Sequence, residues 1–485
     1  MKLPLLSLLV FMPLAAVPLL WLLPARAVRH VVAVAMLLTL GLATAVLLAY
    51  DPAGVRFQLI EQHLWIASLN VHYLLAVDGL SVLFFPATAL LFLGSLVASW
   101  NRVQLAPRQH YSLLLLLQTA NLGIFAAFDT MLFFFFWELT LLPLYFLLAR
   151  WGAAASSAAV AGRYFLIMLA GGIPLLIAFV MLAVSQSVPT FDLMALLAVP
   201  LPHSTQLAVF LLCLVGFGIK VPLVPLHTWL PQFALAAPGS LTALLVGLKL
   251  GAFGLIRFAI PLAPDVVQEM HWLLAGLGTV TLLYGAVGIL GQSNLRVGMA
   301  YASICHVGLA VLGLASLTAS GVQGAVSLLL SFSVATGGCF LLLEFLRQRT
   351  GSTDINALGG VAKSMPLLAS GFLICGLAGV GMPGTSSFPG EFMLILAALE
   401  SHTGAGMAAL FGLSIAAGAF LALYRKAFFG PVVRAEVAQA EDVRPREWAV
   451  LVALIAMVVL IGIYPGPWID LVRPAAEAWA SGIAR

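Results

Sequence analysis

The stretch "GFGIKVPLVPLH", residues 216–227, decides the fold because it interrupts a long apolar run with one lysine and two prolines. Lys220 is followed at once by Pro222, Pro225 and His227. A proline removes a backbone donor and frees the carbonyl one turn earlier. Inside a bilayer that carbonyl needs water or a protein partner. The stretch therefore predicts a broken membrane helix with a hydrated pocket beside Lys220, although a lysine snorkelling from a simple helix end would give a similar pattern.

The composition excludes a soluble protein. Of the 485 residues, 62% are hydrophobic and only 8% are charged, whereas soluble domains carry about 25% charged residues. The net charge of +4 is too small to indicate nucleic-acid binding. The four cysteines lie inside apolar segments without a metal-ligand spacing and are interpreted as small buried hydrophobes. The apolar run at residues 3–23 exceeds the hydrophobic region of a signal peptide and predicts a retained first span.

Spans of about 20 apolar residues are needed to cross a bilayer, and the chain offers about fourteen of them. The predicted fold is an all-α polytopic membrane protein. Most lysines and arginines between spans fall on one side, which predicts that both termini lie on the outer face. The predicted spans are roughly 4–23, 31–50, 79–99, 111–128, 130–149, 163–184, 206–225, 240–262, 272–291, 297–317, 323–346, 366–385, 405–428 and 447–466. We expect the connection 51–78 to lie along the outer surface.

A second interruption, "GVGMPGTSSFPGEF" at residues 379–392, lies five spans after the first. Broken helices at corresponding positions indicate two repeats, and an odd number of spans makes the second repeat inverted. The predicted organisation has broken helices 7 and 12 and four parts. These are the N-terminal helices 1–3 (1–110), a first five-helix repeat (111–262), a second, inverted repeat (263–430) and a C-terminal helix 14 (431–485).

Five ionisable side chains lie inside predicted spans, and each costs about 2.5–3.5 kcal/mol at a helix centre. They are Glu138, Lys220, Lys249, His306 and Glu391. Burial lowers the pKa of an amine and a nearby carboxylate raises it again, so a lysine with a movable glutamate partner can exchange protons near neutral pH. The order of the spans predicts a line from Lys220 through Lys249 and His306 to Glu391, from the inside to the outside.

Each of these residues also has a structural interpretation. Glu138 could pair with a lysine for packing alone, and a lone histidine such as His306 is more often a structural hydrogen bonder. Lys249 is harder to explain structurally because it lies near mid-membrane, beside Gly247 and Gly251, which leave room for water or a close helix. Glu344, Arg347 and Arg349 are interpreted as the end of a span.

Four segments together resemble the antiporter-like subunits of respiratory complex I and of multisubunit Na+/H+ antiporters. A glutamate in "GEFM", here Glu391, resembles the M-type subunits in particular. The resemblance implies that Glu138 and Lys220 form a coupled pair, that Lys249 is a central lysine, and that His306 is a relay towards Glu391. The segments are "FFFFWELTLLPLYFLLARWG" (133–152), "KVPLVPLHTWLP" (220–231), "LRVGMAYASICHVG" (295–308) and "GMPGTSSFPGEFMLI" (381–395).

The chain departs from the family pattern at three positions. Gln232 stands where an acidic residue is usual, and Arg163 stands where a lysine is common. Phe332 replaces the usual histidine of the eleventh span, which would link the centre of the path to its exit. Hydroxyl groups nearby, or water, could bridge the gap. The hydroxyl-bearing residues are Ser331, Ser333 and Thr336.

We therefore expect a proton-translocating membrane subunit of an NADH–quinone oxidoreductase-like complex, an enzyme whose redox chemistry lies in partner subunits. No cofactor or metal is expected in this chain; NADH, FMN, iron–sulfur clusters and quinone are expected in those partners. The expected partners are antiporter-like membrane subunits and the lipid bilayer, and the expected location is a bacterial-type inner membrane. The alternatives are a non-redox cation/proton antiporter subunit, a proton channel of an inorganic-carbon uptake complex, and a structural scaffold.

Overall fold

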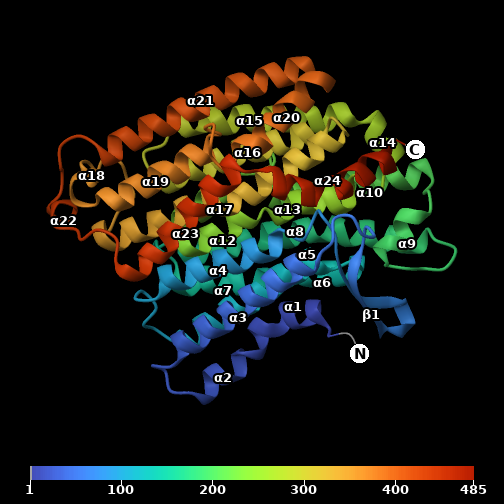
Figure 1. Ribbon diagram of the computed structural model, residues 1–485, viewed down its shortest axis with the longest axis horizontal. Helices are drawn as coiled ribbons and strands as arrows, with labels where there is room; N and C mark the ends of the chain where they lie inside the picture. The colour runs from blue at the N-terminus through green and yellow to red at the C-terminus, as the bar shows by residue number, and fades with distance from the viewer. Residues whose placement is uncertain (1–2, 485) are drawn as a thin grey trace.

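Long apolar helices lying side by side form most of the structure, a computed structural model that describes residues 3–484 (Figure 1). Within these residues, eleven helical stretches have the length and hydropathy to cross a membrane. The other three predicted spans coincide with shorter or more polar helices, α4 (Phe84–Ser99), α5 (Pro107–Ala126) and α19 (Pro366–Gly379). The predicted all-α membrane fold is confirmed.

The N-terminal part contains an element that the all-α prediction missed. Residues 58–77 form an antiparallel hairpin between the predicted second and third spans. Asp129, the N-cap of the next helical hairpin, accepts a hydrogen bond from the backbone N–H of His72 at 2.9 Å and so ties the strands to the bundle. This part comprises α1 (Leu5–Ala15), α2 (Val17–Leu22), α3 (Val28–Ala49), β1 (Gln58–Ile66), the short η1 (Ala67–Leu69), β2 (Val71–Val77) and α4.

The first predicted repeat contains the break that the prolines indicate. α10 ends at Lys220, and regular α-helix resumes only at Trp229. The next span is also interrupted, at Lys249, and continues through one π-helical turn, η2. The elements are α5, α6 (Thr130–Leu139), α7 (Leu141–Trp151), α8 (Ser157–Val184), α9 (Leu193–Ala198), α10 (His203–Lys220), α11 (Trp229–Ala236), α12 (Gly239–Leu248), α13 (Leu250–Gly254) and η2 (Leu255–Ala259).

The second predicted repeat has the matching break. α19 ends at Gly379 and α20 begins at Phe388, so the predicted interruption of the twelfth span is confirmed. Both breaks fall at the positions where prolines remove backbone donors. The elements are α14 (Pro264–Glu269), α15 (His271–Leu290), α16 (Leu295–Leu314), α17 (Ala319–Thr350), α18 (Val361–Ser364), α19, α20 (Phe388–Ser401) and α21 (Thr403–Phe428).

The C-terminal part holds two long helices where one was predicted. α22 (Ala435–Ala438) and α23 (Pro445–Ile463) are followed by α24 (Gly466–Ile483). α24 packs back on the bundle, where the indole N–H of Trp479 donates to the carbonyl of Ile256 at 2.8 Å. Because Ile256 lies in the π-helical turn, α24 supplies a partner for a carbonyl in this irregular backbone.

The core of the bundle lies where α12, α16 and α17 meet. In α17 and in the α12–η2 span, 94% of the most apolar 18-residue window is buried, against 33% in α3. Buried helices can be apolar all round, whereas helices at the edge show one face to lipid. The three central helices carry Lys249, His306 and Phe332. The predicted path therefore runs through the most enclosed part of the molecule.

Candidate functional site

Lys220 is held at the end of α10 by two residues near the end of α6. Its ammonium nitrogen lies 3.8 Å from the ring centroid of Trp137 and donates a hydrogen bond of 3.0 Å to Thr140 Oγ1. The residue is only 8% exposed, which excludes a snorkelling side chain. A cation over an indole face in a desolvated site gains about 2 kcal/mol. The helix break at Pro222 thus places the Lys220 ammonium group inside the bundle, in contact with Trp137 and Thr140.

Glu138 forms no ion pair with Lys220 in this conformation. Among the described residues, the ion pairs do not include these two side chains. Glu138 lies instead against Gly172 of α8, where an added Cβ would collide with its Oε1 atom. It also lines a lateral groove of about 390 Å³ with Trp65 and Phe135. The expected pair is therefore not in ion-pair contact here: Lys220 donates to a hydroxyl, and Glu138 lines the lateral groove.

Lys249 occupies the break between α12 and α13. Its backbone φ is +47°, in the left-handed region that costs a non-glycine residue about 1–3 kcal/mol. The Lys249 ammonium donates to Ser303 Oγ and lies 4.9 Å from the ring centroid of Phe332. Gly251 lets the start of α13 approach the backbone of Phe217 and Val221. The two lysine-bearing breaks are consequently packed directly on one another.

His306 and Glu391 face each other across α16 and α20. Their Nε2 and Oε1 atoms lie 3.4 Å apart, and neither atom has a hydrogen-bond partner among the described residues. His306 Nδ1 lies 2.7 Å from the carbonyl of Ala302, and a carbonyl can only accept, so Nδ1 carries a proton. For a hydrogen bond to form between the pair, a second proton must sit on Nε2 or on the carboxyl group. The two groups thus face each other without a closed hydrogen bond.

Phe332 lies between the central lysine and this pair. Its ring centroid is 5.4 Å from that of His306, in an edge-to-face arrangement, and its face is turned towards Lys249. Ser331 donates to the carbonyl of Ser386 at 2.6 Å, and Ser333 donates to that of Gly247 at 3.1 Å. These two hydroxyls are thus bound to backbone rather than bridging Lys249 to His306. The Phe332 ring therefore stands between Lys249 and His306, where the family pattern has a histidine.

Sequence reasoning missed Ser303, the hydroxyl partner of Lys249. Ser303 lies three residues before His306, and residues three apart share a face of an α-helix. This three-residue spacing could have identified Ser303 from the sequence. In the structure, α16 presents both polar side chains towards the centre, Ser303 to Lys249 and His306 to Glu391.

Two ion pairs with a fully buried carboxylate were also missed. Arg257 forms a two-pronged pair with Asp78, with distances of 2.5 and 2.7 Å. Asp78 belongs to the connection 51–78, which was expected to lie along the outer surface. Glu344 was interpreted as a span end, but it is fully buried, pairs with Arg102 at 2.8 Å and accepts from the backbone N–H of Gly239. Each pair joins elements that are far apart in the chain, so neither could be recognised from local pattern.

The two other departures from the family pattern lie together. Arg163 of α8 and Gln232 of α11 line one groove of about 290 Å³ with Trp229.

Within residues 3–484 no group of three or more histidine, cysteine or acidic side chains could hold a metal ion. All four cysteines are free and buried, as the sequence predicts.

A bundle with two proline-broken helices and an enclosed row of lysine, histidine and glutamate defines the class of antiporter-like membrane subunits. The chain belongs to the family described as "NADH:quinone oxidoreductase/Mrp antiporter, TM", whose model matches residues 127–416.

The chain resembles curated members of this family over nearly its whole length. It is 32% identical to the NADH-quinone oxidoreductase subunit M of Rhodobacter capsulatus, over 97% of this chain and 95% of the relative. It is 34% identical to the subunit M of Pseudomonas aeruginosa, over 84% and 82%. Among solved structures, a chain of respiratory complex I from Thermus thermophilus with bound NADH matches with a TM-score of 0.91 and 33% identity, over 99% of both chains. A chain of the Mrp complex from Dietzia sp. shares the fold, with a TM-score of 0.85 and 20% identity, over 100% of both chains.

Proposed function

We propose that this protein is a proton-translocating membrane subunit of an NADH–quinone oxidoreductase-like complex, with other membrane subunits of that complex as its partners. Its relatives are named as subunits of such complexes, and its fold matches a chain of one. The observation that carries the proposal is the row of buried titratable groups in the core of the bundle. A membrane protein has no structural need for these groups, since each is costly to insert.

The proposed route enters at Lys220, passes Lys249 and leaves through His306 and Glu391. Lys220 and Lys249 lie on two breaks that contact each other through Gly251. Lys249 donates to Ser303, which lies three residues before His306 on α16, and His306 Nε2 lies 3.4 Å from Glu391 Oε1. Each step joins groups that can both hold and release a proton.

Coupling to the neighbouring subunits is assigned to Glu138. In the observed conformation, the Lys220 ammonium donates to Thr140. Glu138, two residues before Thr140 in the chain, lines a lateral groove. A conformation in which Lys220 exchanges Thr140 for Glu138 would stabilise the charged ammonium, because an opposite charge favours it. Movement of Glu138 between its groove and Lys220 would then switch the lysine between releasing and retaining its proton.

The redox chemistry is assigned to partner subunits, which would hold NADH, FMN, iron–sulfur clusters and quinone. The protein is placed in a bacterial-type inner membrane, with both termini on the outer face. The distribution of basic residues supports this orientation, since cytoplasmic connections are enriched in lysine and arginine. We also propose a division into four parts, 1–110, 111–262, 263–430 and 431–485, and the two matched breaks support it.

Lys249→Ala in the assembled complex tests the route. We expect NADH-driven proton uptake into inverted membrane vesicles to fall at least about tenfold, because a central charge that must bind a proton is absent. Lys426→Ala, which removes an exposed cation at the end of α21, is the matched control and should pump normally. Unchanged pumping by Lys249→Ala in a complex of normal composition would contradict the proposed route.

The non-redox antiporter is the second candidate, and the shared fold with the Mrp complex chain favours testing it. Purification of the native complex from its own membranes, followed by identification of its subunits, separates the two. Flavin- and cluster-bearing partners support the oxidoreductase. Partners without them, together with Na+-dependent proton exchange in vesicles, would support the antiporter instead.

A further inference from the structure

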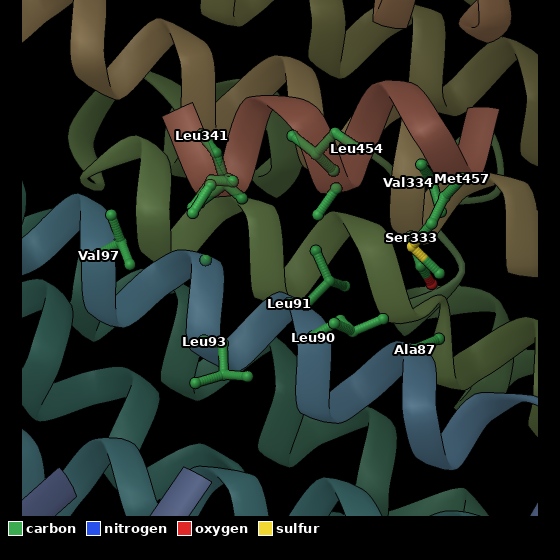
Figure 2. A pocket seen from close by; sticks show the side chains of 14 residues that line it. Ala87, Leu90, Leu91, Leu93, Val97, Ser333, Val334, Leu341, Leu454 and Met457 are labelled. Atoms are coloured by element: carbon green, nitrogen blue, oxygen red, sulfur yellow. The ribbon is translucent and has the colours of Figure 1, made fainter. Parts of the chain in front are cut away.

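An apolar groove runs along the outside of the bundle between α4 and α23. It has a volume of about 250 Å³, and its floor is formed by α17. Figure 2 shows α4, in blue, and α23, in red, passing one another with the labelled side chains of Leu91, Leu454 and Met457 between them. Small residues at Ala87, Gly94, Ala449 and Ala453 leave the space open.

The length of the groove matches one leaflet of a bilayer. On α4 its lining residues extend from Ala87 to Val97, and on α23 from Ala449 to Met457. At 1.5 Å per helical residue, the ten steps along α4 cover about 15 Å. The hydrocarbon core of a bilayer is about 30 Å thick, so the groove spans roughly one leaflet. A single extended acyl chain has the shape that fills such a space.

An exposed cation stands at one end of the groove. Arg446 lies one helical turn before Ala449 and Val450, on the same face of α23, and Trp100 lies one turn after Val97 on α4. The guanidinium carbon of Arg446 is 5.3 Å from the Trp100 ring centroid, and its Nη2 donates to Asn101 Oδ1 at 3.2 Å. Among residues 3–484, Arg446 forms no ion pair with a carboxylate.

We infer that this groove binds one anionic phospholipid, whose phosphate pairs with Arg446 and one of whose acyl chains lies between α4 and α23. A cation placed at the end of a leaflet-long apolar groove has the arrangement that an anionic headgroup and its chain require. Trp100 suits the same boundary, since indole rings collect at the membrane interface.

The inner end of the groove lies close to the helix break at Lys249. Leu91 lines the groove and also fits a notch formed by Gly247 and Gly337, so that a Cβ added at either glycine would collide with it. Ser333, on the floor, donates to the carbonyl of Gly247, two residues before Lys249. An acyl chain in the groove would thus press on the side chain that packs against this break.

The experiment is a titration of the purified, delipidated complex with defined lipids, followed by native mass spectrometry of the bound adducts. The probes are dioleoyl phosphatidylglycerol, dioleoyl phosphatidylcholine and inorganic phosphate. We expect the first phosphatidylglycerol adduct to form about fivefold more tightly than the phosphatidylcholine adduct, the preference expected from one basic residue near an anionic headgroup.

Two variants separate the headgroup from the chain. Arg446→Gln should abolish the preference for phosphatidylglycerol, while its control Lys426→Gln should retain it. Ala453→Phe, which fills the groove, should remove the first adduct of either lipid. Its control on the same helix is Val452→Phe, at a residue that is 51% exposed outside the groove, and binding there should be unchanged.

Three results would overturn the inference. Equal affinity for the two lipids would exclude a headgroup site at Arg446. An unchanged first adduct in Ala453→Phe would exclude the groove. Displacement of phosphatidylglycerol by millimolar inorganic phosphate would indicate a phosphate site without an acyl-chain groove. None of these outcomes depends on whether the complex pumps protons.

Discussion

The ammonium of Lys249 lies 4.9 Å from the ring centroid of Phe332, and this ring stands between the central lysine and the exit pair. The Phe332 ring also contacts His306, whose ring meets it edge-to-face. A phenyl ring cannot carry a proton, but its face can hold a cation. In the proposed route, Phe332 positions Lys249, and Ser303 and water carry the proton.

Phe332→Leu tests this positioning role. Leucine is apolar but has no aromatic face, so the ammonium loses about 1–2 kcal/mol of cation–π interaction. We expect pumping, measured by NADH-driven dye quenching in inverted vesicles, to fall about fivefold or more. Phe332→His, which keeps an aromatic ring and adds proton-carrying nitrogens, should pump at nearly the parental rate. Equal rates in the two variants would show that the ring has no such role.

Ser303→Ala should also impair proton transfer at Lys249, but through the loss of a hydrogen bond. It removes the hydroxyl that accepts from the Lys249 ammonium, and a hydrogen bond to a charged group contributes about 1.5–3 kcal/mol. Both the thermal stability of the purified protein and the pumping rate are expected to fall. Ser99→Ala is the matched control, since the Ser99 hydroxyl is buried but donates only to the Leu96 carbonyl in its own helix. A stable Ser303→Ala variant that pumps normally would remove Ser303 from the route.

The two proline-rich breaks could be predicted from the sequence because their cause is local. Pro222 and Pro383 lack a backbone donor wherever they occur, and the helices stop at Lys220 and Gly379, just before them. The membrane spans could be predicted for a similar reason, since their length and apolarity are properties of each segment alone. The five ionisable groups could also be predicted, because each is a charged or titratable residue within an otherwise apolar segment.

The interruption at Lys249 could not be predicted in this way. No proline lies nearby, and the partners of its side chain, Ser303 and Phe332, lie on other helices. The hairpin of residues 58–77 was missed because short apolar runs do not distinguish a strand from a surface segment. The partner of Asp78 was missed because Arg257 lies 179 residues away.

Asp78→Asn is expected to destabilise the protein strongly. Both side chains of the Asp78–Arg257 pair are almost completely buried, and removing one partner leaves an uncompensated charge that costs about 3–5 kcal/mol. Asp470→Asn breaks the exposed pair with Arg473 on α24 and should cost less than about 1 kcal/mol. Thermal unfolding of the two variants in the same detergent measures the difference. Comparable losses would mean that the buried pair is not closed in solution.

The contact between His271 and His402 predicts a loss of stability in mild acid. The two ring nitrogens lie 2.7 Å apart at the start of α15 and in the turn between α20 and α21. Burial, followed by the neighbouring charge of His271, lowers the pKa of His402 below its ordinary value of 6.5. A histidine with a lowered pKa binds fewer protons in the folded state than in the unfolded state, so its contribution to stability is complete above pH 6.5 and declines as the pH falls below that value.

The measurement is the unfolding temperature of the purified protein between pH 8.0 and 5.5. We expect it to fall below about pH 6.5 and to fall less in His402→Gln, where the glutamine amide can still bond to His271 but does not titrate. His30→Gln, at an exposed histidine on α3, should keep the parental slope. Because other histidines also titrate in this range, the informative quantity is the difference between the parent and His402→Gln at each pH. A difference that stays constant from pH 8.0 to 5.5 would show that the two histidines do not share this contact in solution.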